Sequence, residues 1–255
     1  MTFRELFPVG EQARYLAWTL GGRKSPVKLT MKSGGCLPMR RQEGPMRDYG
    51  TAYDVFVHQL YRIDGITSPR TIVDLGANVG YATLYFALRY PEAKIYAFEP
   101  HPEHFEQVRQ LISLNRFETR VTAMNAAVGA APALLYLSNE GTCSKVMAES
   151  GGNAVAVKMI DFFDWASGIG PIDLLKIDIE GGEFAILSDP RFETLPCKHV
   201  IMEAHNDAEH PDATHWTTRR LEETGFDPRV TQNDPGLGVS MIYARKKSLD
   251  AARKP

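Results

Sequence analysis

The chain has 255 residues, of which 44% are hydrophobic, and a formal net charge of −2 from 29 basic and 31 acidic side chains. That length fits one sizeable hydrophobic core, so we expect a single α/β domain with an appendage. The balanced charge lacks the strong positive field that nucleic-acid binding needs, which argues against a nucleic-acid partner. The three cysteines form no C-x-x-C pair, which argues against a disulfide framework and favours a reducing compartment.

The amino-terminal sequence lacks the features of a targeting segment. Charged residues such as Arg4 and Glu5 interrupt its apolar positions, so it has no signal-peptide core. No apolar run approaches the roughly 20 residues that a membrane span requires. We therefore expect a soluble, cytoplasmic protein. The sequence leaves open whether the chain forms a homo-oligomer.

Residues 1–68 differ in pattern from the rest of the chain. Apolar residues at helical spacing predict helices over 11–20 and 51–61, separated by a basic stretch rich in glycine and proline. We interpret residues 1–68 as an amino-terminal helical cap on the substrate side, packed over the catalytic edge of a sheet. Residues 69–247 are expected to form the main domain, and residues 248–255 a frayed tail.

From residue 71 onward, predicted strands and helices alternate. The predicted strands are 71–75, 94–98, 121–125, 133–137, 154–159, 174–179, 200–204, 228–231 and 239–244. Helices are expected to begin near Val79 and at Pro102, and to cover 183–187 and 213–224. Such alternation predicts a mostly parallel sheet covered on both faces, closed by an antiparallel pair of strands.

The segment TIVDLGANVGYATLYFALRY predicts a strand, a tight turn and a helix in direct succession. Gly76 and Gly80 flank the turn, and the absence of a Cβ atom lets the backbone approach a ligand closely. Glu99 ends the second strand, where its carboxylate can hold the hydroxyl groups of a ribose. The sequence therefore predicts a nucleoside-binding site.

The turn reads G-A-N-V-G and departs from the G-x-G-x-x-G pattern of dinucleotide sites. Without that glycine set, a helix amino terminus cannot press against a pyrophosphate. Asp74, directly before the turn, would repel phosphate but suits a cationic or amino-bearing ligand. We therefore expect S-adenosylmethionine, whose amine and sulfonium are positive, in place of NAD.

Acidic residues also end two later strands. Asp178 and Glu180 follow one strand in LLKIDIEGGE, and Glu203 and His205 end the next in HVIMEAH. The carboxyl ends of parallel strands meet at one sheet edge, where α/β enzymes place their chemistry. Clustered carboxylates require a cation, a shared proton or strong hydrogen bonds. Helix capping and solvated strand ends are the alternative interpretation.

Together these motifs resemble the FkbM-type methyltransferases, a family of S-adenosylmethionine-dependent O-methyltransferases. The resemblance rests on VDLGANVGYATLYFA, FEP, NAAVG, LLKIDIEGGEFAIL and an acid–x–histidine strand end. It implies the class I methyltransferase fold, which is Rossmann-like, with a mostly parallel seven-stranded sheet and an antiparallel last strand. It also implies a small-molecule acceptor with a hydroxyl group, such as a sugar, glycoside or polyketide-type natural product.

The resemblance also assigns residues to parts of the cofactor. The loop after the first strand would bind the methionyl portion, Glu99 the ribose, and residues after the third strand the adenine. The implied cofactor-binding residues are Tyr61, Asp74, Gly76, Ala77, Asn78, Gly80, Glu99, Asn125, Ala126 and Asp178. Asp178 and Glu180 would lie below the transferred methyl group.

A hydroxyl acceptor has a high pKa, so it needs a general base or a metal to become a nucleophile. His205 is the expected base, because the unperturbed pKa of imidazole lies near neutrality. Glu203 would orient the ring or be the base itself. Alternatively, Asp178, Glu180, Glu203 and His205 could ligate a divalent ion such as Mg²⁺. We favour base catalysis without a required metal.

Two other functions stay open. An N-methyltransferase acting on an amine of a small molecule, protein or nucleic acid would use the same cofactor loop. It would normally carry a basic face or a Pro-Pro-Tyr-type loop, and LLKIDIEGG has neither. A non-catalytic S-adenosylmethionine-binding module would be expected to lose the acids at the strand ends, which this chain keeps.

Overall fold

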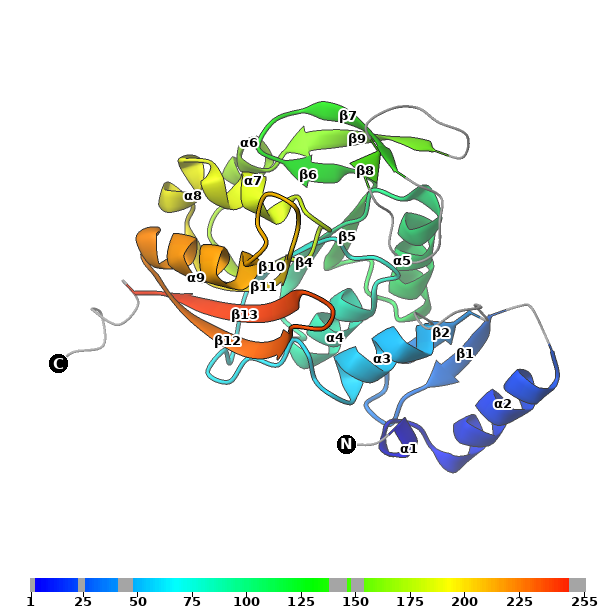
Figure 1. Ribbon diagram of the computed structural model, residues 1–255. Coiled ribbons are helices and arrows are strands. Elements are labelled where there is room, and N and C mark those ends of the chain that lie inside the picture. The colour runs from blue at the N-terminus through cyan, green and yellow to red at the C-terminus, as the bar shows by residue number, and fades with distance from the viewer. Residues whose placement is uncertain (1–2, 23–25, 41–47, 138–145, 148–153, 248–255) are drawn as a thin grey trace.

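A seven-stranded sheet forms the centre of the computed structural model, which describes residues 3–22, 26–40, 48–137, 146–147 and 154–247 (Figure 1). Its strands are β3 (Thr71–Leu75), β4 (Lys94–Phe98), β5 (Val121–Met124), β10 (Ile172–Ile177), β11 (Cys197–His205), β12 (Phe226–Asp234) and β13 (Val239–Lys246). They lie in the order β12-β13-β11-β10-β3-β4-β5. All neighbours pair in parallel except β13, which is antiparallel to both β11 and β12. This confirms the predicted sheet with its antiparallel last strand.

Helices cover both faces of the sheet, as its sequence pattern requires. They are α4 (Tyr81–Arg89), α5 (Pro102–Leu114), α6 (Phe162–Ser167), α7 (Glu183–Ser188), α8 (Arg191–Thr194) and α9 (Ala213–Glu223). Successive residues of β3 alternate between two cores, because side chains along a strand point to opposite faces. Ile72 packs in the cluster that contains Leu84 of α4, and Val73 packs in the cluster that contains Leu221 of α9.

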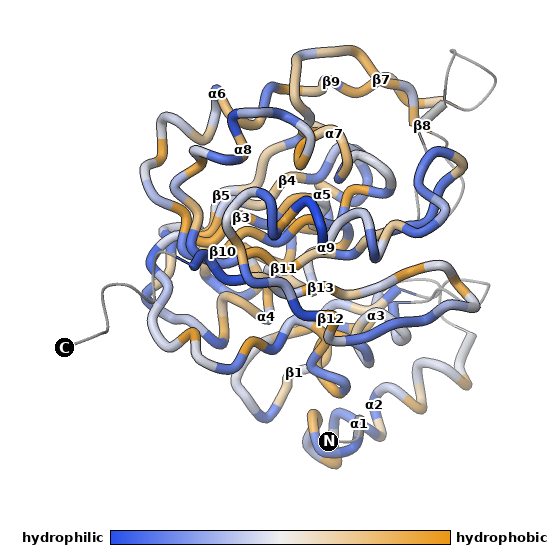
Figure 2. Tube along the Cα trace, turned by 60° about the vertical axis from the view of Figure 1, so that its left-hand side comes forward, coloured by the Kyte–Doolittle hydropathy of each residue, from blue (hydrophilic) through white to orange (hydrophobic). Residues whose placement is uncertain are grey.

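Burial along the strands explains their composition. Five of the six residues of β10 are buried, so an apolar run without alternation is stable there. At the sheet edge, β12 is exposed along most of its length. Figure 2 shows the same contrast, with hydrophobic segments gathered on the central strands and β12 largely hydrophilic.

The amino-terminal region contains a hairpin that the sequence analysis did not anticipate. Its elements are α1 (Phe3–Leu6), α2 (Val9–Leu20), β1 (Val27–Thr30), β2 (Cys36–Met39) and α3 (Asp48–Phe56). Strands β1 and β2 pair antiparallel. The Tyr81 hydroxyl of α4 donates to the carbonyl oxygen of Pro38 over 2.5 Å, and the Cys36 amide donates to Asn115 Oδ1 over 2.7 Å. The hairpin therefore packs on the α4 and α5 side of the sheet, and the segment after α3 carries Tyr61 to the sheet edge.

A second, four-stranded sheet has the order β6-β9-β7-β8. Its strands are β6 (Ala127–Gly129), β7 (Ala133–Leu137), β8 (Val146–Met147) and β9 (Val155–Asp161). The strands predicted over 133–137 and 154–159 thus exist, but they pair with each other outside the central sheet. Figure 1 shows this second sheet beside the β5 end of the central one.

In the part of the chain that the structure describes, no helix is long and apolar enough to cross a membrane. The tail predicted over 248–255 lies outside the described residues.

Candidate active site

Gly76 ends the first central strand at a point where two backbone segments touch. A Cβ atom at this position would lie 1.7 Å from the carbonyl oxygen of Asp178, and the φ angle of Gly76 is +78°. Its amide donates to the carbonyl oxygen of Phe98 over 3.0 Å, as does that of Ala77 over 2.8 Å. The close approach of the turn after β10 therefore requires glycine at this position.

Glu99 is the acid at the end of β4 and is only 5% exposed. Its Oε2 accepts the amide of Asn78 over 2.8 Å, and its Oε1 accepts the amide of His101 over 2.8 Å. Burial raises the pKa of this carboxyl to about 7, although the two amides and the Lys176 charge act in the opposite direction. Asn78 adopts a φ of +51°, so the turn aims its amide at Glu99.

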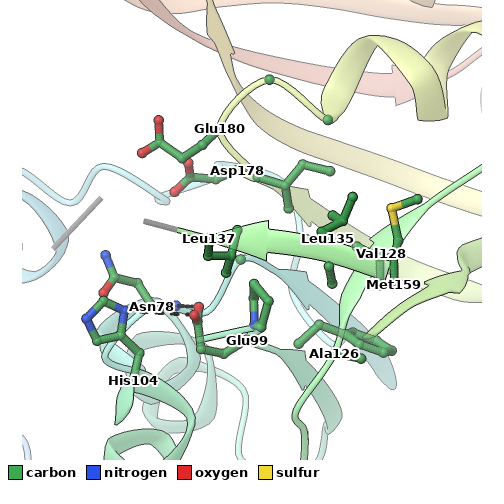
Figure 3. Close-up of a pocket in the computed structure, with 17 residues that line it drawn as sticks. Asn78, Glu99, His104, Ala126, Val128, Leu135, Leu137, Met159, Asp178 and Glu180 are labelled. Carbon is green, nitrogen blue, oxygen red and sulfur yellow. Dashed lines mark hydrogen bonds and ion pairs between the residues drawn. The ribbon is translucent and has the colours of Figure 1, made fainter. Parts of the chain in front are cut away.

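A cavity of about 380 Å³ opens beside Glu99 (Figure 3). Its polar lining includes Asn78, Glu99, His104, Asp178 and Glu180. The opposite wall is apolar, and its labelled side chains are Ala126, Val128, Leu135, Leu137 and Met159. A cavity of this size with few polar groups is typical of small-molecule sites. The Glu99 carboxylate suits the hydroxyl groups of a ribose, and the apolar wall suits the ring of a nucleoside base.

Only part of the predicted cofactor set lines this cavity. Gly76, Asn78, Glu99, Ala126 and Asp178 do so. His104 and the apolar wall contributed by β7 and β9 were not among the predicted cofactor residues. The short apolar run over 133–137 predicted a strand, but nothing local in the sequence showed which face it would cover.

The other residues predicted to bind the cofactor do not line the cavity, and three of them support the backbone around it. Ala77 is 3% exposed beneath the turn, and Gly80 caps the amino end of α4 with a φ of +88°. Asn125 Nδ2 donates to the carbonyl oxygens of Glu99 and Pro100, each over 2.9 Å. These residues hold the backbone that carries Glu99 and Asn78.

Asp74 is fully buried and faces the protein interior. Its Oδ1 lies 3.1 Å from Lys176 Nζ, and its Oδ2 accepts the hydroxyl of Thr83 over 2.6 Å. Burial alone lowers the pKa of Lys176, but the charges of Asp74 and Asp178 outweigh it and raise that pKa above its usual value. The expected direct role of Asp74 toward a cationic ligand therefore needs correction, because its partners belong to the chain.

The acids at the ends of β10 and β11 converge as predicted. Tyr61 lies between two of them, with its hydroxyl 3.4 Å from Asp178 Oδ2 and 3.5 Å from Glu203 Oε1. Burial first, and then the charges of Asp178 and Glu203, keep the pKa of Tyr61 well above its usual value. The Tyr61 hydroxyl therefore stays protonated and can donate to these carboxylates.

His205 lies among acids on both sides of its ring. Nε2 is 3.6 Å from Glu203 Oε2 and 3.9 Å from Glu180 Oε2, and Nδ1 is 3.2 Å from Glu183 Oε1. Burial lowers the pKa of His205, but its contacts with Glu183 and Glu203 and the charge of Asp178 outweigh this and raise it to about 11. The surrounding carboxylates therefore favour the protonated imidazolium, which has no lone pair to accept a further proton. This charge environment disfavours His205 as the general base and favours Glu203, the alternative expected from the sequence.

The same residues also have spacing that suits a metal ion. Asp178, Glu203 and His205 each offer one ligand atom, and these atoms lie within 4.8 Å of one another. Carboxylate oxygens with one imidazole suit a divalent cation. Glu180, the fourth residue predicted for such a site, is not part of this group.

The fold and the site together define a class of enzyme. A sheet with one reversed strand, a glycine turn after β3, an acid after β4 and a cavity between them are the features of a class I S-adenosylmethionine-dependent methyltransferase. The family model described as "Methyltransferase FkbM domain" matches residues 74–228, which is more than half of the chain. This chain belongs to the FkbM methyltransferase family.

Two fungal proteins are similar over most of their length. Methyltransferase 1 of Beauveria bassiana is 27% identical over 224 residues, covering 76% of this chain and 88% of that protein. Methyltransferase sdnD of Sordaria araneosa is 28% identical over 235 residues, with the same two coverages.

Two solved structures align with most of the chain at low sequence identity. A protein of Pyrococcus horikoshii to which transferase activity has been attributed aligns with a TM-score of 0.50 at 16% identity. That alignment covers 91% of this chain and 80% of the other. TYW2 of M. jannaschii, in complex with AdoMet, aligns with a TM-score of 0.46 at 14% identity, covering 88% of this chain and 85% of that chain.

Proposed function

We propose that this methyltransferase transfers the methyl group to a hydroxyl of a small-molecule acceptor, a sugar, glycoside or polyketide-type natural product. One observation carries the proposal: two carboxylates, Asp178 and Glu203, meet around the Tyr61 hydroxyl, and Asp178 also lines the cavity. A hydroxyl nucleophile must lose its proton during transfer, and carboxylates at this position can receive it.

The lining of the cavity suits the ribose and the adenine of S-adenosylmethionine. The Glu99 carboxylate can accept hydrogen bonds from ribose hydroxyls, and the apolar wall of Leu135, Leu137 and Met159 can cover an adenine ring. A side chain at Gly76 would collide with the Asp178 carbonyl oxygen, so glycine here keeps the two turns that line the cavity in contact. S-adenosylmethionine, when bound, supplies the methyl group as an electrophile on its sulfonium.

Glu203 is the better proton acceptor of the two carboxylates. Burial and the nearby charge of Asp178 raise the pKa of Glu203, and the contact with His205 only partly opposes this. A carboxylate of raised pKa takes a proton from a hydroxyl more readily than an ordinary one does. The positive charge of His205, with Nε2 3.6 Å from Oε2, favours the ionised form of Glu203, which is the form that accepts a proton.

Glu180 is suited to hold the acceptor. Its side chain is 38% exposed where the cavity opens, and its backbone has a φ of +54°. A residue other than glycine in this region carries backbone strain, which is commonly retained where a side chain serves function. Its carboxylate can accept hydrogen bonds from further hydroxyl groups of a polyol.

Methylation with ¹³C-methyl-labelled S-adenosylmethionine and a panel of glycosides, polyketides and amines tests the proposal. The label should appear as an O-methyl group in a product, and Glu203→Gln should reduce kcat by about 100-fold or more. Glu222→Gln, on the exposed side of α9, is the matched control and should keep full activity. A product carrying only N-methyl groups contradicts O-methylation.

Chelation separates the base from the metal alternative. We expect exhaustive treatment with a chelator to leave the rate unchanged, because the carboxylates and Tyr61 are sufficient for proton transfer. Loss of turnover that Mg²⁺ restores would show that Asp178, Glu203 and His205 act as ligands.

A further inference from the structure

Glu183, the first residue of α7, is a fully buried carboxylate close to the proposed reaction centre. It binds three groups of the chain. Oε1 accepts the amide of Ile179 over 3.1 Å and lies 3.2 Å from His205 Nδ1, and Oε2 accepts the amide of Gly181 over 2.7 Å. A buried carboxylate with this set of donors is stable because each contact replaces a lost hydrogen bond to water.

These contacts decide which way the His205 ring presents its nitrogens. An ionised carboxylate only accepts hydrogen bonds, so a hydrogen bond to Glu183 requires the proton on Nδ1. Nε2 then faces Glu203 and Glu180, at 3.6 and 3.9 Å. A carboxylate behind a histidine fixes its tautomer and orientation in many enzyme sites.

Glu183 also fixes the backbone between β10 and α7. The turn from Ile179 to Gly182 contains Glu180 with a φ of +54° and Gly181 with a φ of +100°. Because Glu183 accepts amides from two residues of this turn, it holds the strained segment that carries Glu180. One buried side chain therefore connects the turn after β10 to the end of β11.

We propose that Glu183 is a positioning residue of the methyltransferase. It orients His205 so that Nε2 supports Glu203, the proton acceptor, and it holds Glu180 at the cavity mouth. The effect of Glu183 on catalysis rests on the proposed function. Its orientation of His205 does not depend on which acceptor is methylated.

The imidazole nitrogens of the free enzyme give the first test. Two-bond ¹H–¹⁵N NMR reports which ring nitrogens carry protons, and His205→Gln identifies the His205 signals by their disappearance. We expect the wild-type protein to show a protonated Nδ1 with the chemical shift of a hydrogen bond to a carboxylate, and we expect Glu183→Gln to lose that shift. A wild-type His205 whose Nδ1 carries no proton overturns the proposal without any variant, so the test stands even if Glu183→Gln does not fold.

Kinetics give the second test, with the glycoside or polyketide that the product screen identifies. We expect Glu183→Gln to lower kcat by about 10–100-fold, while the Kd for S-adenosylmethionine, measured by calorimetry, stays within about threefold. Glu183→Gln combined with His205→Gln should lose less activity than the two single losses predict together, because part of the effect of Glu183 acts through His205. Glu222→Gln is the control and should match the wild type in both tests.

Additive losses in the double variant, or an unchanged kcat in Glu183→Gln, overturn the positioning role. If the product screen finds only N-methylation, the proposed function fails while the NMR result still decides whether Glu183 orients His205. The two failures are therefore distinguishable.

Discussion

Lys176 and Asp74 form an ion pair inside the core, with Nζ 3.1 Å from Oδ1 and side chains that are 1% and 0% exposed. Lys176 Nζ also donates to the carbonyl oxygen of Gly76 over 2.6 Å and lies 3.4 Å from Asp178 Oδ2. One buried ammonium therefore connects the cofactor turn after β3 with the reaction centre after β10.

Removing the ammonium should destabilise the fold strongly. Lys176→Met keeps most of the side-chain volume but leaves Asp74 buried without its cation. We expect the free energy of unfolding to fall by about 3–5 kcal/mol, the usual result of breaking one side of a buried pair. Urea denaturation followed by circular dichroism measures it.

Lys198→Met is the matched control for that change. Lys198 Nζ lies 2.7 Å from Asp173 Oδ1, but its side chain is 48% exposed. Water screens this pair, so its loss should cost less than about 1 kcal/mol. Equal losses in the two variants would contradict the role assigned to Lys176.

A methyl group at position 76 should disrupt both stability and cofactor binding. In Gly76→Ala, Cβ would lie 1.7 Å from the Asp178 carbonyl oxygen, and the φ of +78° is unfavourable for alanine. We expect a loss of about 3 kcal/mol or more from strain and displacement together. Calorimetric titration with S-adenosylmethionine should show no binding.

Gly170→Ala separates the two causes. Gly170 has a φ of +79°, and nothing lies within 4 Å of the Cβ position. This variant carries the backbone strain alone, about 1–2 kcal/mol, and should bind S-adenosylmethionine normally. If both variants lose the same stability, the contact between the two turns is unimportant.

Cofactor affinity should depend on pH through Glu99, whose pKa is about 7. Ribose hydroxyls donate to the ionised carboxylate, so the Kd for S-adenosylmethionine should be about tenfold weaker at pH 6 than at pH 8. Glu99→Gln should remove this dependence, and Glu103→Gln, an exposed neighbour, should keep it. A flat profile in the wild type would refute the ribose assignment.

The same group affects the free protein in the opposite direction. The folded pKa of Glu99, about 7, lies above its unfolded value of 4.5, so the folded protein binds more protons between these two pH values. Its contribution to the free energy of unfolding therefore falls as pH rises from about 4.5 to 7. Urea titrations of wild type and Glu99→Gln across this window measure the difference.

His205 should stabilise the fold most at low pH. Its pKa rises from 6.5 to about 11 on folding, so the stability it contributes is fully present below pH 6.5 and is lost as pH rises toward 11. The destabilisation caused by His205→Gln should therefore shrink from pH 6.5 to pH 9.5, by at most about 1.4 kcal/mol for each pH unit. Urea denaturation at several pH values tests this, and a constant difference would show that His205 is not charged.

Much of the central fold was predictable because its signals are local. Strands β3 and β4 have the predicted bounds, α5 begins at Pro102, and α9 covers almost all of 213–224. The hairpin of β1 and β2 was missed, since short strands in a segment rich in glycine and proline leave little periodicity. The pairing of β7 with β9 was missed because register depends on contacts between distant residues.

By itself, the sequence determined the order of elements, the glycine turn, and the acids at the strand ends, because each depends on neighbours along the chain. Only the tertiary structure decided what those residues do. It buried Asp74 against Lys176, which lies 102 positions away, and it placed Glu183 behind His205, where the neighbouring carboxylates favour the charged ring in spite of its burial. Distances between strands set hydrogen bonds and pKa values, and no local pattern of residues encodes those distances.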